Sequence, residues 1–76
     1  MNKFRRKALS EIAEQIEALK DELESLRDEE QGYMDNMPEN LQGSERYEAA
    51  EEAVSNLDDA LNSLDEAISS IEEASA

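Results

Sequence analysis

The sequence predicts an all-α protein: a two-helix antiparallel coiled-coil hairpin that dimerises into a four-helix bundle. Three observations favour this fold class. Two segments carry apolar residues at heptad spacing, a short segment of turn-forming residues separates them, and no alternating pattern of a β-strand competes. The 76 residues form a single domain, with a first helix at about 3–34, a loop at about 35–44 and a second helix at about 45–74.

The first helix is predicted from apolar residues that alternate three and four positions apart. They are Leu9, Ile12, Ile16, Leu19, Leu23 and Leu26. This spacing is typical of a coiled-coil seam, which packs against a partner helix. Gly32 weakens the helix near its end, so we expect it to stop somewhere between residues 31 and 36.

The second helix continues the same alternation and adds a seven-residue repeat. Its seam residues are Tyr47, Ala50, Val54, Leu57, Leu61, Leu64, Ile68 and Ile71. The repeat also places Ala53, Ala60 and Ala67 on one row, the alanine row. Because a broad apolar stripe suits a helix with more than one neighbour, we assign the alanine row to self-association. The alternative is a monomeric hairpin, with alanine present only as the best helix former.

The segment between the seams carries residues that end one helix and begin another. Pro38 favours a first helical turn, so we expect a short turn of helix or 3₁₀-helix at about 38–42. Gly43 is a natural stop, and Ser44 is a good N-cap for the second helix.

Folding the chain back about Asn40 sets the large seam residues of the two helices opposite one another. Leu23 then lies opposite Leu57, and Leu26 opposite Val54. A slip of one residue would break these layers together. This register predicts an antiparallel rod about 45 Å long, at a rise of ~1.5 Å per residue.

The charge is strongly acidic and unevenly distributed. Seven basic residues stand against 21 acidic ones, a net charge of −14. Four of the basic residues form the basic segment: Lys3, Arg5, Arg6 and Lys7. We expect this segment to pair with Glu72 and Glu73 across the hairpin, the alternative being contact with a membrane or nucleic acid. The overall charge repels nucleic acid and anionic membranes and attracts basic protein surfaces.

Paired carboxylates recur every seven residues along the second helix. Together they form the acidic stripe: Glu51, Glu52, Asp58, Asp59, Asp65 and Glu66. One interpretation is a mimic of a nucleic-acid backbone, which also presents regularly spaced negative charge. The other is a solvated face that keeps the protein soluble. Ten acids stand against the single base Arg46 in this helix, which favours a use for the charge.

Aromatic and sulfur-containing residues gather near the loop. Tyr33, Met37, Leu41 and Tyr47 form this hairpin tip. Tyrosine and methionine are enriched at protein interfaces, so the tip is a candidate partner-binding patch. A small core that closes the hairpin is the alternative.

Several classes of function are disfavoured. The chain contains no cysteine and no histidine, so we expect no disulfide, zinc site, cofactor or catalytic residue. The spacing of residues 35–46 also fails the calcium-loop pattern. No apolar run follows the basic segment, so we expect no signal peptide or membrane span, and a cytoplasmic protein.

The loop sequence YMDNMPENLQGSER (residues 33–46), set between two acidic alanine-rich helices, resembles small hypothetical proteins of bacteriophages that infect Gram-positive bacteria. No function is established for that group, so the resemblance implies no site residues. A phage origin implies action in the host cytoplasm and favours a role in counter-defence, since small acidic phage proteins often occupy basic grooves of host nucleases or repressors.

These observations favour a non-catalytic protein-binding module, an inhibitor whose acidic stripe docks in a basic groove of a nucleic-acid-handling protein. The alternative is a homo-oligomeric structural or scaffolding protein that binds through the hairpin tip and the alanine row. A third possibility is a subunit that is stable only in a larger complex.

Overall fold

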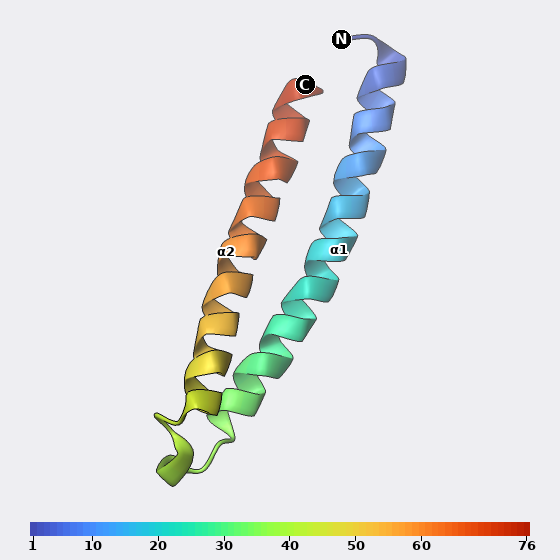
Figure 1. Cartoon of the computed structure of the whole chain (residues 1–76). Helices are drawn as coiled ribbons and strands as arrows, with labels where there is room; N and C mark the ends of the chain where they lie inside the picture. The colour runs from blue at the N-terminus through green and yellow to red at the C-terminus, as the bar shows by residue number, and fades with distance from the viewer.

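The computed structural model describes all residues 1–76 and is a helical hairpin (Figure 1). Helix α1 spans Lys3–Asp35, the 3₁₀-helix η1 spans Glu39–Leu41, and α2 spans Glu45–Ala74. The two long helices pack side by side in opposite directions and there are no strands, which confirms the all-α hairpin. The molecule is a thin rod with principal extents of 59 × 15 × 12 Å.

Local side-chain and backbone groups fix where each long helix begins. The Asn2 side chain accepts a hydrogen bond of 2.7 Å from the backbone N–H of Arg5, which caps α1. Ser44 caps α2 in the same way, since its Oγ accepts from the N–H of Tyr47 at 3.3 Å. Gly43 has a φ of 95°, a conformation that costs other residues energy. The chain therefore turns into α2 at a glycine followed by a capping serine.

The core is thin because two helices share only one line of contact. Six residues are buried, and no large side chain is fully enclosed. The buried residues are Ala13, Met34, Met37, Ala50, Val54 and Ile68. Most other seam residues of α2 are half-buried, including Leu57, Leu61, Leu64 and Ile71.

The rotation of α1 against α2 differs from the sequence prediction. We call Ile12, Leu19, Leu26 and Tyr33 the apolar row; their exposed fractions are 46, 60, 58 and 47%. The predicted layer of Leu26 against Val54 is therefore wrong, because Leu26 points to solvent while Val54 is buried. The row of α1 that replaces it contains Ala13, Lys20, Arg27 and Met34, all buried or half-buried.

The reason for this rotation is that only two adjacent rows of α1 can face a single partner helix. One is the row of Leu9, Ile16 and Leu23, which is half-buried. The second row that faces α2 contains Lys20 and Arg27, whose side chains combine an apolar stem with a charged end that forms an ion pair with α2. The apolar row is left without a neighbour.

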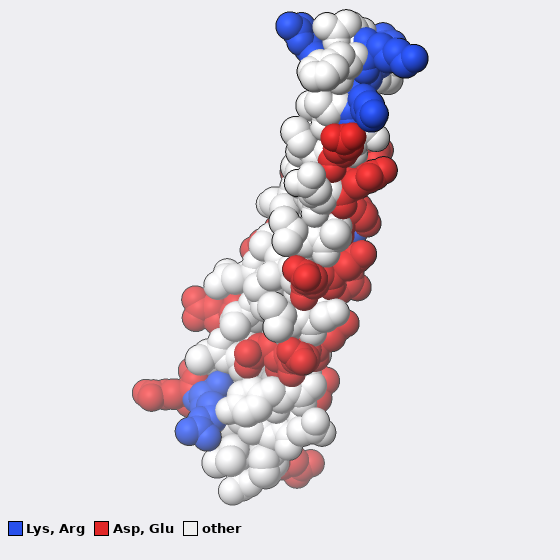
Figure 2. All heavy atoms as spheres, turned by 90° about the vertical axis from the view of Figure 1, so that its right-hand side faces the viewer, with Lys and Arg blue, Asp and Glu red and all other residues white.

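The charges are segregated along the rod. Figure 2 shows basic side chains gathered at the end where α1 begins, with carboxylates along much of the rod's length. No ion pair of the structure involves the basic segment, Glu72 or Glu73, so the expected pairing between these groups is not formed.

Candidate functional site: interaction surfaces of the hairpin

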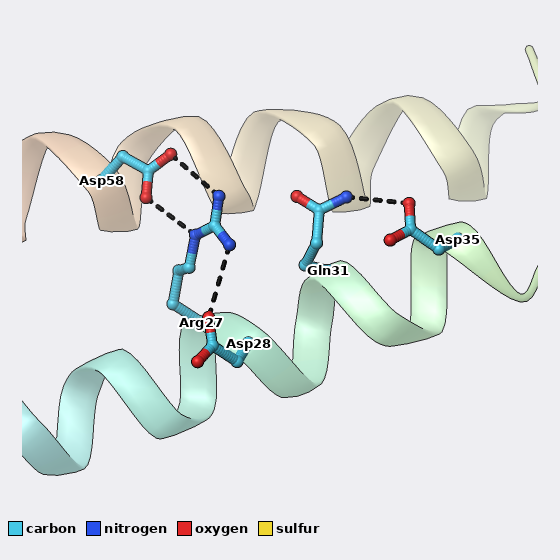
Figure 3. Close-up of polar contacts among 5 residues, drawn as sticks. All are labelled: Arg27, Asp28, Gln31, Asp35 and Asp58. Carbon is cyan, nitrogen blue, oxygen red and sulfur yellow. Dashed lines mark hydrogen bonds and ion pairs between the residues drawn. The ribbon is translucent and has the colours of Figure 1, made fainter.

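Two ion pairs join the helices and define one edge of their interface. Arg27 donates from Nε to Oδ1 of Asp58 at 2.8 Å and from Nη2 to Oδ2 at 3.3 Å, a two-bond pair drawn in Figure 3. Lys20 Nζ lies 2.7 Å from Oδ1 of Asp65. Each pair is seven residues from the other on both helices, so both report the same antiparallel register.

These ion pairs also shift the titration of the two cations. The hydrogen bond to Asp58 raises the pKa of Arg27, with smaller contributions from the charges of Asp58 and Asp28, while partial desolvation opposes the shift. The hydrogen bond to Asp65 raises the pKa of Lys20 in the same manner. Both cations therefore stay charged at physiological pH, and both pairs remain partly exposed, where such contacts are individually weak.

The register of the ion pairs explains why the basic segment stays unpaired. One heptad before Lys20 the row holds Ala13, which has no charge to offer Glu72. One heptad before Ala13 the same row holds Arg6, and the position opposite Arg6 in this register lies beyond the end of α2. Lys7 and Glu73 lie on rows that face outward. The basic segment is thus left in solvent, and its Phe4 is 81% exposed.

The acidic stripe is divided by the same contacts. Asp58 and Asp65 turn toward α1 and are engaged by Arg27 and Lys20. The remaining four stripe residues are exposed and form no ion pair: Glu51, Glu52, Asp59 and Glu66. The structure therefore leaves a narrower set of carboxylates free to meet a partner.

The hairpin tip is divided as well. Met37 is buried and Tyr47 is half-buried, and they lie with the buried Met34 where the helices meet the loop. Gln42 bonds across the loop to the carbonyl of Met37 at 3.4 Å. Tyr33 and Leu41 remain exposed, so only these two tip residues are accessible to a partner.

The apolar row and the alanine row lie on the same side of the hairpin. At 100° per residue, Leu26 and Arg27 lie on opposite flanks of Leu23. On α2, Ala60 and Asp58 lie on opposite flanks of Leu57. Because Arg27 and Asp58 meet at one edge of the interface, the apolar row and the alanine row both flank the other edge.

A shallow surface hollow on that side supports this placement. Residues of both helices line it: Leu23, Leu26, Tyr33, Leu57, Glu29 and Glu30. Ala53 and Ala60 are half-buried beside α1, and Ala67 is exposed. The four rows together make one apolar face, built from the apolar row, the Leu9–Leu23 row, the Leu57–Ile71 row and the alanine row.

The sequence prediction placed the apolar row inside the hairpin and so missed its exposure. One signal could have shown this. Lys20 and Arg27 are the only cations between positions 8 and 45, and they are seven residues apart, as are Asp58 and Asp65. Pairing Lys20 with Asp65 and Arg27 with Asp58 from the sequence would have predicted the observed rotation of α1.

No group of three or more acidic side chains is placed to hold a metal ion. Neither long helix contains a stretch apolar enough to cross a bilayer. Comparison of the chain with protein-family models, with curated proteins and with solved structures gives no match.

Proposed function

We propose that this chain is a non-catalytic assembly protein that works as a homodimer, in which two hairpins pack through their apolar faces as a four-helix bundle. The observation that carries the proposal is the exposed apolar row. Four large apolar side chains recur every seven residues from Ile12 to Tyr33, and the hairpin itself leaves them in water. Heptad-spaced apolar residues are the pattern by which helices pack on one another.

The size of the apolar face fits a stable dimer. The apolar face runs from Leu9 to Tyr33 on α1, about 36 Å at ~1.5 Å per residue, and is as wide as the 15 Å breadth of the rod, which gives a projected area of roughly 540 Å². Accessible area exceeds projected area, and a standard protein interface buries about 800 Å² per partner. The alanine row contributes by letting a second backbone approach closely.

Sedimentation equilibrium of the wild type and of the double variant Leu19→Ser, Leu26→Ser tests this proposal. We expect a dimer for the wild type, and a monomer with largely unchanged helicity for the variant, because both side chains are already more than half exposed in the hairpin. Leu41→Ser is the matched control: Leu41 is also exposed but lies at the tip, so it should leave the dimer intact. A wild type that stays monomeric at about 0.1 mM would contradict the proposal, since a micromolar dimer needs only about 8 kcal/mol.

A second function is compatible with the first. We propose that the free carboxylates of the acidic stripe bind a basic protein surface, such as the nucleic-acid groove of a nuclease or repressor. The supporting observation is that Glu51, Glu52, Asp59 and Glu66 are exposed and unpaired, with Arg46 the one cation of α2. Long-range attraction between opposite charges would then speed the encounter.

Charge reversal of Asp59 and Glu66 to lysine tests this second function. Asp58 and Asp65 are unsuitable targets, because their loss would also break the contacts with Arg27 and Lys20. We expect the variant to lose proteins captured from a bacterial lysate at low salt. The matched control, Glu14→Lys with Asp21→Lys, makes the same charge change on exposed residues of α1 and should retain them. Equal capture by both variants would refute a role for the acidic stripe.

A further inference from the structure

We propose that the two hairpins of the dimer pack end for end, so that the basic segment of each copy lies beside the acidic loop end of the other. This inference rests on the proposed homodimer and specifies its geometry. It follows from three observations: the symmetry of the apolar row, the position of Arg5, and the unpaired charges at the two ends of the rod.

The apolar row is self-complementary when one copy is reversed. A twofold axis midway between Leu19 and Leu26 sets Leu19 of one copy against Leu26 of the second copy. The same axis sets Ile12 against Tyr33 of the second copy. All four residues then meet an apolar residue, as the self-matching interface of a twofold dimer requires.

Arg5 lies on the same side of α1 as the apolar row, on the N-terminal side of Ile12. It stands one heptad before Ile12 and therefore points along the same side of α1. Under the twofold axis, Arg5 comes level with the loop of the second copy, which follows the end of α1 at Asp35 and contains Glu39. In a parallel dimer the basic segments of both copies would instead lie at the same end of the bundle, and their like charges would repel.

The basic segment has no partner within its own hairpin. Its cations form no ion pair, and the first turn of α1 contains no acidic residue. These cations also stand at a helix N-terminus, where the helix dipole disfavours positive charge. A neighbouring anionic group would pair with these cations and offset their unfavourable interaction with the helix dipole.

The loop end supplies such a neighbour. Asp35, Glu39, Glu45 and Glu48 are exposed there, and none forms an ion pair. Arg46 is the one cation at that end. End-for-end packing brings the basic segment next to these acids at both ends of the dimer, whereas parallel packing would bring like charges together at both ends.

Electron–electron distance measurements on spin-labelled single-cysteine variants test the arrangement, because the native chain has no cysteine. Phe4→Cys labels the exposed end of α1, and Glu22→Cys labels a position next to the proposed axis. In the end-for-end dimer the two labels at position 4 lie about 55 Å apart along the axis, at ~1.5 Å per residue, while those at position 22 are close together. A short distance at both positions would show a parallel dimer and overturn the inference.

Charge reversal of Arg5 gives an independent readout on the unlabelled protein. We expect Arg5→Glu to weaken the dimer about tenfold, since exposed ion pairs are individually weak but the change acts at both ends of the dimer. Arg46→Glu changes the net charge equally but removes a cation from the acidic end, so it should not weaken the dimer. A tighter dimer with Arg5→Glu would instead indicate parallel packing. If sedimentation shows no wild-type dimer, the proposed function fails with it, whereas a dimer of the wrong orientation leaves that function standing.

Discussion

Lys20 and Arg27 determine more of this structure than their small number suggests. Their side chains are 19 and 25% exposed, so their apolar stems cover part of the seam while their charged ends reach Asp65 and Asp58. Individually such pairs are weak, but they occupy a row of α1 that an apolar row could have taken. Together with the buried Ala13 and Met34, these two cations form the row of α1 that faces α2 in place of the apolar row.

Gly43 is the residue whose backbone conformation is most specific. With a φ of 95°, it joins η1 to the start of α2 in a region that side-chain-bearing residues adopt at a cost. Open space around it means that a methyl group would clash with nothing. Any loss of stability on substitution would therefore report backbone strain and not a steric clash.

The two glycines offer a matched pair for testing this. Gly43→Ala should lower the free energy of unfolding by about 1–2 kcal/mol, the cost of the left-handed conformation. Gly32→Ala should raise it by about 0.8–1 kcal/mol, because Gly32 lies inside α1 and an added Cβ would enter open space. Urea unfolding followed by circular dichroism, at one protein concentration, measures both. Changes of the same sign in the two variants would contradict the assignment of Gly43.

At the scale of the helices, the sequence predicted the elements well and their relative rotation poorly. The apolar alternation, Pro38, Gly43 and Ser44 are local signals, and local physics fixes helix ends and turns. Rotation depends on which of three adjacent rows of α1 meets α2, and all three contain residues able to pack. The third row contains Lys20 and Arg27, whose apolar stems are not visible in a hydrophobic pattern.

The same limit applies to the candidate surfaces. The acidic stripe was visible as a repeat, but its division into paired and free carboxylates depended on the rotation of α1. The division of the hairpin tip, with Met37 buried and Leu41 exposed, depended on how the loop packs against the helix ends. Sequence patterns thus located the residues, while packing decided which of them reach solvent.

For the whole molecule, charge repulsion and apolar packing act on assembly in opposite directions. Each hairpin carries a net charge of −14, so bringing two copies together is opposed by general repulsion. The apolar face and the unlike ends of the rod favour association. The stability of the dimer is therefore expected to depend on ionic strength, and the direction of that dependence shows which interaction holds the two copies together.

We expect added salt to strengthen the homodimer and to weaken any complex with a basic partner. Raising the ionic strength from about 0.1 M to about 1 M shortens the Debye length from about 10 Å to about 3 Å, which screens the repulsion between two acidic rods while leaving apolar contacts in place. The same screening removes attraction between the free carboxylates and a basic groove. Sedimentation at both ionic strengths measures the first effect, and salt elution from immobilised protein measures the second.

The Leu19→Ser, Leu26→Ser variant should stay monomeric at both ionic strengths, which separates specific packing from salt-induced aggregation. A homodimer that dissociates at high salt would mean that contacts between the charged ends, and not the apolar row, hold the two copies together.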